Sequence, residues 1–178
     1  MKPIKKMTQA ELAAYVHDHL RKSGIEVVLS GGAAVGIYSS GEYVSRDIDL
    51  VNARFAGVGK IEKAMAEIGF TAIGRHYEHP ETDHIVEFPP GPLHFGDGRA
   101  AEVQEMKFRT GTLRIISPTD CIKDRLAHYY HWGDRQCLQQ AILVASRHMI
   151  DLNVIQSWSR AEGKLDEYEK IKGNLQGK

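Results

Sequence analysis

Two aspartates alternate with apolar residues in the segment Asp47-Ile48-Asp49-Leu50-Val51. Successive side chains of a β-strand point to opposite faces, so Asp47 and Asp49 are predicted to share one face, about 7 Å apart along the strand. Two carboxylates at that spacing repel each other unless a cation lies between them, and hard divalent cations such as Mg²⁺ prefer carboxylate oxygen. The pattern therefore indicates a metal-binding strand.

A glycine pair, Gly31-Gly32, lies between an apolar strand predicted at 25–29 and a short helix predicted at 33–38. Glycine lets the backbone approach a phosphate closely, and the first N–H groups of a helix have no partner within it. A phosphate cradle followed by metal-binding aspartates is the equipment for phosphoryl or nucleotidyl transfer. The two motifs in this order therefore favour such a transferase over a surface strand with two solvated aspartates.

Two other phosphate-binding motifs do not fit the sequence. Gly31 and Gly36 have the spacing of a Walker A loop, but Ile37 and Tyr38 stand where that loop requires lysine and then serine or threonine. The G-x-G-x-x-G dinucleotide fingerprint is absent from the sequence, and no series of βαβ units is predicted after the glycine pair. The sequence therefore indicates neither a P-loop enzyme nor a dinucleotide-binding enzyme.

The elements around these motifs predict an α+β core followed by helices. Thr8 and Glu11 have the spacing of a capping box, and an apolar residue then recurs every four positions. Strands are predicted at 25–29, 47–51, 70–73, 85–88, 102–108 and 112–116, and helices at 33–38 and 60–68. Ser117 has the place of a cap for a further helix. The core is therefore predicted over residues 1–116 and a helical extension over residues 117–178.

The composition is that of an ordinary globular protein, with 42% hydrophobic and 26% charged residues among 178. Lys and Arg together number 23, as do Asp and Glu, so the formal net charge is zero. Proteins that coat nucleic acid carry a large positive excess, which disfavours that class. Two cysteines, Cys121 and Cys137, are too few for a disulfide scaffold, and no apolar run is long enough to span a membrane. We therefore expect a cytoplasmic protein with reduced thiols.

The order of a strand, Gly-Gly, a short helix and an Asp-x-Asp strand resembles the DNA polymerase β-like nucleotidyltransferase superfamily. Within it, the chain is most similar to the small minimal nucleotidyltransferases and AbiEii-like proteins. Residues 117–123, with Arg125 and Asp134-Arg135 beyond them, resemble the region after the core in AbiEii-like proteins. The resemblance covers about residues 25–135. It implies a small mixed sheet with helices on one side, followed by the helical extension.

The resemblance also implies a metal site. Asp47 and Asp49 match the first two of the three carboxylates that hold two Mg²⁺ ions in this superfamily. For the third we favour Glu87, which lies between apolar residues on the strand predicted at 85–88. Glu102 and Glu105 are its rivals.

A nucleoside triphosphate (NTP) site is implied in the same way. Gly31 and Gly32 would seat the phosphates, and Lys123, in the first turns of the helix after the core, would reach the triphosphate as a point charge. The superfamily usually has serine or threonine immediately after the glycine position, whereas this chain has Ala33. Ser30, just before the pair, is the candidate hydroxyl in its place.

The predicted function is metal-dependent transfer of a nucleoside monophosphate from an NTP to a hydroxyl group. The acceptor is a protein, a tRNA or a small molecule such as an antibiotic, and the resemblance favours a toxin–antitoxin or phage-defence role. The alternative is a catalytically silent protein of the same fold, whose helical extension binds a cognate toxin or antitoxin or forms a homo-oligomer. Ala33 favours this alternative.

Two clusters of histidines and aromatic residues allow other interpretations. The first has a spacing that matches no established zinc site, so a solvated connection is favoured over metal binding; it comprises His76, His79, Asp83 and His84. The second surrounds His128 and His131 and includes Trp132. Packing between helix and core is the favoured role of these aromatic residues, and stacking on a nucleobase is the alternative.

Overall fold

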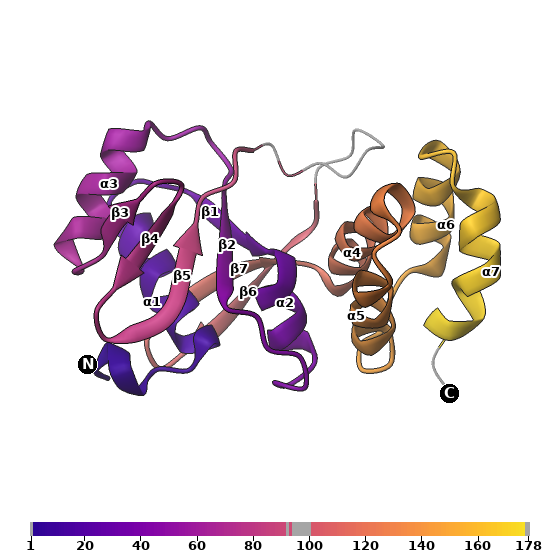
Figure 1. Ribbon diagram of the computed structural model, residues 1–178, viewed down its shortest axis with the longest axis horizontal. Helices are drawn as coiled ribbons and strands as arrows, with labels where there is room; N and C mark the ends of the chain where they lie inside the picture. The colour runs from indigo at the N-terminus through magenta and orange to yellow at the C-terminus, as the bar shows by residue number, and fades with distance from the viewer. Residues whose placement is uncertain (1, 92, 94–100, 177–178) are drawn as a thin grey trace.

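A seven-stranded mixed sheet and a group of C-terminal helices make up the computed structural model, which describes residues 2–91, 93 and 101–176 (Figure 1). The strands are β1 (Val27–Ser30), β2 (Asp47–Asn52), β3 (Thr71–Ile73), β4 (His76–His79), β5 (Thr82–Glu87), β6 (Val103–Phe108) and β7 (Gly111–Ile116). The helices are the 3₁₀ turn η1 (Ile4–Lys6), α1 (Gln9–Lys22), α2 (Gly31–Tyr38), α3 (Val58–Glu67), α4 (Pro118–Trp132), α5 (Arg135–Ala145), α6 (Leu152–Ala161) and α7 (Leu165–Leu175).

The strands lie in the order β3-β4-β5-β2-β1-β7-β6. β2 runs parallel to β5 and β1 runs parallel to β7, whereas β1 and β2 are antiparallel. The outer pairs β3–β4, β4–β5 and β6–β7 are antiparallel. The mixed sheet is therefore as predicted, and it places β1 and β5, which are far apart in sequence, on either side of the Asp-x-Asp strand.

Helices α1, α2 and α3 cover the sheet. The capping box of α1 is confirmed, because Glu11 N–H donates to Thr8 Oγ1 over 3.3 Å and Thr8 N–H donates to Glu11 Oε2 over 2.9 Å. Helix α1 packs on β7 and β1 and contacts both α2 and α3. The apolar face of α1 is fully buried at Leu12, Val16 and Leu20, as its four-residue repeat predicts.

The alternation predicted for the Asp-x-Asp strand is present in β2. Ile48 and Leu50 are fully buried in the core, whereas Asp47 is exposed and Asp49 is half-buried. Because neighbouring residues of a strand point to opposite faces, the two aspartates lie on the face away from that core.

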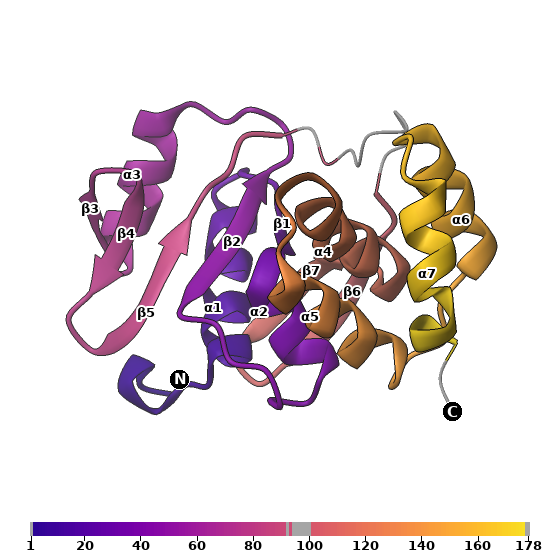
Figure 2. The ribbon, with the colours of Figure 1, turned by 45° about the vertical axis from the view of Figure 1, so that its right-hand side comes forward.

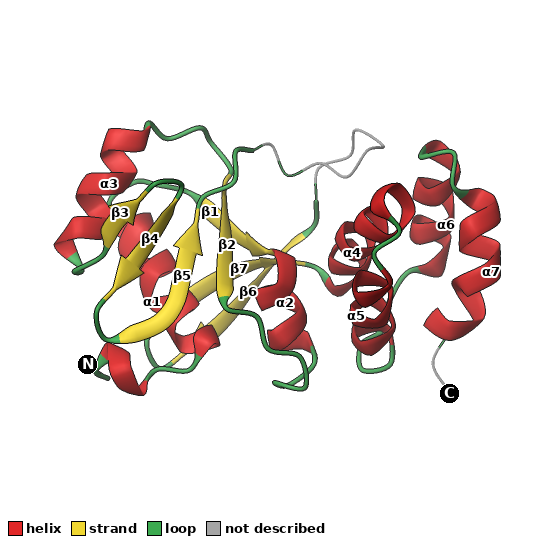
Figure 3. Cartoon of the chain, in the orientation of Figure 1, coloured by secondary structure: helices red, strands yellow, loops and turns green. Residues whose placement is uncertain are grey.

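Four helices joined by loops, and no strand, follow β7 in the part of the chain that the structure describes (Figure 3). Helix α4 begins as predicted, with Asp120 N–H donating over 3.2 Å to the side chain of Ser117 and Pro118 in the first turn. Helices α4 and α5 pack together next to α2, and α6 and α7 lie beyond them, on the side away from the sheet (Figure 2). None of the helices described is long and apolar enough to cross a membrane.

Two local predictions were wrong. The helix predicted at 33–38 begins at Gly31, so the glycine pair forms its first residues and not a turn before it. The polar, histidine-rich connection predicted after residue 73 contains strand β4, which pairs with β3 and β5. Pairing with neighbouring strands places this segment in the sheet despite its polar composition.

Candidate active site

Three polar residues line up across neighbouring strands on the face that carries the aspartates. Asp49 of β2 is opposite Ser30 of β1 and, on its other side, opposite Glu87 of β5. Residues opposite each other in a sheet share a face, so Ser30, Asp49 and Glu87 form one row. Asp47 lies one pleat along β2 on the same face. This is the placement that three carboxylates of one site require, and the role of Glu87 as a ligand stays a prediction.

The rival carboxylates lie elsewhere. Glu105 is on β6, which is separated from β2 by β1 and β7 in the sheet. Glu102 immediately precedes β6, and its N–H donates to Asp120 Oδ2 over 2.6 Å. The strand order therefore favours Glu87 over both rivals.

Gly31 brings the first turn of α2 against Asp49. It has a φ of 67°, in the left-handed region, and a Cβ atom built on it would lie only 2.1 Å from Asp49 Oδ2. The positive φ favours glycine, and a side chain at this position would displace the Asp49 carboxylate. The carboxylate therefore lies directly beside the start of the helix, where backbone N–H groups have no partner within the helix.

Gly32 packs against the loop before β2 and not against Asp49. A Cβ atom on Gly32 would lie 3.0 Å from Ser45 Oγ and 3.3 Å from Tyr43 Cε1. Gly32 therefore leaves room for the loop that leads into β2, and Gly31 is the glycine at the carboxylate. Ser30 is the N-cap residue of α2, and its buried side chain makes no capping hydrogen bond within the described structure.

A cavity of about 420 Å³ opens in front of this row, between the sheet and α4. Its described lining is contributed by β1, α2, β2, the segment after β5, and α4, and comprises Ser30, Gly31, Asp49, Val51, Pro89, Pro90, Leu93, Asp124, Arg125 and His128. The cavity thus joins the predicted phosphate cradle and one aspartate to a wall from the helical extension. Asp47 and Glu87 are not among the described lining residues, although they share the face of Asp49.

Asp49 is a carboxylate of the cavity whose pKa is shifted by its surroundings. Burial, together with the negative charges of Glu87 and Asp124, raises the pKa of Asp49 to about 6, and the positive charge of Arg125 opposes this shift. The cavity therefore holds an excess of negative charge that a bound cation would relieve.

Arg125 contributes a positive charge to the cavity wall. Its Nη2 and Nε donate to Asp124 Oδ2 over 2.6 and 3.1 Å, and its Nη1 donates to Gln140 Oε1 over 3.4 Å. Asp124 and Gln140 therefore hold the guanidinium in a fixed orientation. Sequence reasoning did not select Arg125 or Asp124 for the site and gave nucleobase stacking only as the alternative for the cluster around His128, although the four-residue spacing of Asp124 and His128 places both on one face of a helix.

Lys123, predicted to bind the triphosphate, lies in the interior of the helical extension. Its Nζ is 3.1 Å from Asp120 Oδ1 and 6.0 Å from the centre of the Trp158 ring, and the side chain is buried. Lys123 is not among the described residues that line the cavity. In this arrangement Arg125, and not Lys123, is at the cavity, and the role of Lys123 in triphosphate binding stays a prediction.

The carboxylates fit a divalent cation by their chemistry. Asp47, Asp49 and Glu87 offer hard oxygen donors on one face, and the negative charge of Glu87 adds to burial in raising the pKa of Asp49. In their present positions, however, no three His, Cys, Asp or Glu side chains among residues 2–91, 93 and 101–176 are close enough to hold a metal ion. In the first histidine cluster, His76 is hydrogen-bonded to Glu78 over 2.9 Å.

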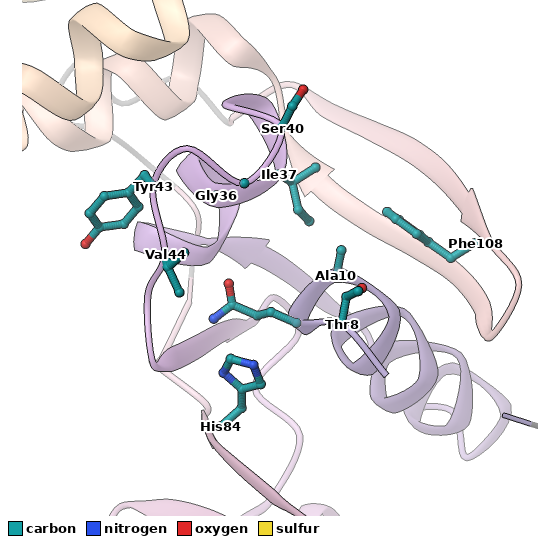
Figure 4. A pocket seen from close by; sticks show the side chains of 11 residues that line it. Thr8, Ala10, Gly36, Ile37, Ser40, Tyr43, Val44, His84 and Phe108 are labelled. Carbon is teal, nitrogen blue, oxygen red and sulfur yellow. The ribbon is translucent and has the colours of Figure 1, made fainter. Parts of the chain in front are cut away.

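A second cavity of about 420 Å³ lies between α1, α2 and the loop after α2 (Figure 4). Its described lining is mostly apolar and contains no carboxylate, so the predicted chemistry does not belong there. Gln9, on its wall, donates from Nε2 to the backbone oxygens of Ser45 and Asp47 over 2.7 and 3.3 Å. Gln9 therefore fixes the start of β2 and, with it, the position of Asp47.

Comparison with known proteins shows the fold. No family model matches the chain, and no curated protein does either. Among solved structures, an antigenic nucleotidyltransferase-like protein from Paracoccidioides brasiliensis matches with a TM-score of 0.67 and 16% identity over 96% of this chain and 93% of its own. The crystal structure of ANT(2'')-Ia with adenylyl-2''-tobramycin matches with a TM-score of 0.56 and 14% identity over 93% of this chain and 99% of its own. The solution structure of the antibiotic-resistance factor ANT(2'')-Ia gives a TM-score of 0.53 at 13% identity, over 94% of each chain. The chain therefore has a nucleotidyltransferase-like fold.

Proposed function

We propose that the protein transfers a nucleoside monophosphate from an NTP to a hydroxyl group. The observation that carries this proposal is the contact between Asp49 and Gly31, which joins a carboxylate strand to the first turn of a helix inside one cavity. A carboxylate suited to a metal ion and backbone N–H groups suited to phosphate thus meet at a single place. The nucleotidyltransferase-like fold, which extends over nearly the whole chain, supports the proposal.

Several groups of the cavity would bind the phosphates of the NTP. The backbone N–H groups at Gly31, at the start of α2, would bind phosphate oxygens, and the Ser30 hydroxyl would assist them. Arg125, held by Asp124, would balance phosphate charge from the opposite wall. Pro89 lines the same cavity, after β5. These groups would orient the α-phosphate toward the acceptor.

The transfer itself is a displacement at phosphorus. The acceptor hydroxyl oxygen forms a bond to the α-phosphorus, and the bond from that phosphorus to the bridging oxygen of the β-phosphate breaks. Pyrophosphate leaves with the electron pair, and a carboxylate of the site accepts the hydroxyl proton. Fixed positive groups near the phosphates would stabilise the charge that develops on them.

Asp47, Asp49 and Glu87 would hold Mg²⁺, with two ions expected. Bound Mg²⁺ would supply charge stabilisation at the phosphates and would lower the pKa of the attacking hydroxyl. The three carboxylates must approach one another more closely than they do in this arrangement, and the cation would offset both the burial of the Asp49 carboxylate and its repulsion by Glu87.

The acceptor is proposed only by class: a hydroxyl of a small molecule, a protein or a tRNA. ANT(2'')-Ia, solved with adenylyl-2''-tobramycin, supports a small-molecule acceptor. The zero net charge weighs against a long nucleic acid. A role in a toxin–antitoxin or phage-defence system remains part of the proposal.

A catalytically silent protein of this fold is the second candidate. Two observations favour it: Ala33 stands where the superfamily usually has a hydroxyl, and the described carboxylates do not already form a three-ligand site. In that case the helical extension would bind a protein partner, such as a cognate toxin or antitoxin.

Calorimetric titration with each of the four NTPs, with and without Mg²⁺, separates the two candidates. Catalytic function predicts NTP binding that requires Mg²⁺ and that is lost in the Asp49→Asn variant. Glu105→Gln, a carboxylate change outside the cavity, should leave binding unchanged. A folded wild-type protein that binds none of the four NTPs would support the silent alternative.

A further inference from the structure

One face of α4 continues from the cavity to the end of the helix. Asp124, His128 and Trp132 follow one another at four-residue intervals, so their side chains lie on the same face. Asp124 and His128 line the cavity, and the rings of His128 and Trp132 are in contact, with centroids 5.1 Å apart. The face therefore carries the cavity wall outward to an indole ring.

Trp132 is exposed to an unusual degree for its type. The side chain of Trp132 is 73% exposed, whereas Trp158, the other tryptophan, is 1% exposed in the interior of the helical extension. Helix α4 ends with Trp132, because Gly133 follows in the left-handed conformation with a φ of 68°. The indole ring is therefore exposed beside His128, a residue of the cavity wall, and is not packed into the core, contrary to the role that sequence analysis favoured.

Side chains of different character follow one another along this part of α4: a guanidinium, an imidazole and an indole ring. Arg125 and His128 both line the cavity with Asp49, and Trp132 is seven residues after Arg125, about 10 Å along the helix axis. An NTP has the same order: anionic phosphates, a polar sugar and an aromatic base. If an NTP bound with its phosphates at Gly31 and Arg125 and extended along α4, its base would lie next to Trp132.

We propose that Trp132, together with His128, forms a stacking platform for the nucleobase of the NTP. This inference rests on the proposed function, because it assumes that the phosphates bind beside Gly31. Every base has a π-face, so a stacking platform binds all four bases and prefers the larger purines. The site should therefore accept all four NTPs, with the purine nucleotides bound more tightly, and should not select one base by hydrogen bonding.

The test compares an NTP with inorganic tripolyphosphate, which has the same phosphates and no base. In calorimetric titrations with Mg²⁺, Trp132→Ala should weaken ATP binding roughly ten- to a hundredfold and should leave tripolyphosphate binding unchanged. Trp132→Phe should restore most of the ATP affinity, because phenylalanine keeps an aromatic face. Met149→Ala, which changes a wholly exposed side chain between α5 and α6, is the matched control and should change neither affinity.

A spectroscopic measurement tests the same contact directly. In a Trp158→Phe variant the only tryptophan fluorescence comes from Trp132, and ATP should quench it whereas tripolyphosphate should not. The titrations of Trp132→Ala do not depend on this core substitution being tolerated.

Two results would overturn the inference, and they differ in what else they overturn. If wild type and Trp132→Ala bind ATP equally well, the platform is wrong and the proposed function stands. If folded wild-type protein binds tripolyphosphate and no NTP, or neither of them, both the platform and the proposed function are wrong.

Discussion

The carboxylate of Asp49 lies against the backbone of Gly31, so closely that a Cβ atom on residue 31 would be 2.1 Å from Asp49 Oδ2. This contact joins β2 to the first turn of α2. It also gives Gly31 two independent reasons to be glycine, the contact itself and a φ of 67°. The predicted metal ligand and the predicted phosphate cradle are therefore parts of one structure.

Gly31→Ala should damage both stability and nucleotide binding. The left-handed conformation should lower the free energy of unfolding by about 1–2 kcal/mol, and the new methyl group should displace the Asp49 carboxylate. Mg²⁺-dependent NTP affinity should fall at least tenfold. Gly32→Ala is the matched control: its methyl group meets Ser45 and not Asp49, so NTP affinity should change much less than stability. Chemical denaturation and calorimetry measure the two effects, and equal losses of affinity in both variants would contradict this assignment.

Asp49→Asn should stabilise the metal-free protein at neutral pH. The pKa of Asp49 is raised from 3.8 to about 6, so the folded state holds this proton more tightly than the unfolded state does. The resulting stabilisation is present below pH 4 and is lost as pH rises through 6, at most about 3 kcal/mol. Wild type should therefore lose stability relative to Asp49→Asn between pH 4 and 6. Denaturation curves across this range should show the two proteins diverging, and parallel pH profiles would contradict the shift.

Lys123→Met should lower stability, whereas Arg125→Met should lower the affinity for NTP. Lys123 forms a buried ion pair with Asp120, so its loss should lower the free energy of unfolding by about 3 kcal/mol and leave the NTP affinity of the folded protein unchanged. Arg125 lines the cavity, so its loss should weaken NTP binding at least tenfold. NTP affinities of both variants, measured well below their melting temperatures, show which cation contributes to binding. Weaker NTP binding by folded Lys123→Met would restore the original assignment of this lysine.

Glu87→Gln should weaken Mg²⁺ binding and lower transfer activity severely, because Glu87 is the carboxylate next to Asp49 on the neighbouring strand. Glu105→Gln, on β6, removes an equal charge from an exposed position far along the sheet and should do little. Calorimetric Mg²⁺ titration compares the two variants. Equal Mg²⁺ affinities in Glu87→Gln and wild type would exclude Glu87 as a ligand.

Local signals in the sequence predicted much of the fold. The capping box at Thr8 and Glu11, the cap at Ser117 and the alternation in β2 all depend on residues a few positions apart, and all are confirmed. The apolar–acid–apolar pattern around Glu87 predicted a strand in the same way. That strand is β5, which pairs in parallel with β2 in the mixed sheet.

The far wall of the cavity was not predictable from local patterns. Which face of α4 meets the sheet depends on how α4 packs against α2 and α5, a long-range property. Lys123 was therefore chosen by its charge, although its pairing with Asp120 keeps it buried, and Arg125 was passed over. The left-handed conformation of Gly31 inside α2 likewise depends on its contact with Asp49.

The central claim is tested most directly by nucleotide transfer itself. Wild-type protein and the double variant Asp47→Asn/Asp49→Asn would each be incubated with Mg²⁺, a cell extract and each of the four NTPs labelled at the α-phosphate. Wild type should transfer label to an acceptor in the extract with at least one NTP. The double variant should transfer none while remaining folded. Label transferred equally by both proteins, or by neither with any NTP, would contradict the claim that this cavity carries out nucleotidyl transfer.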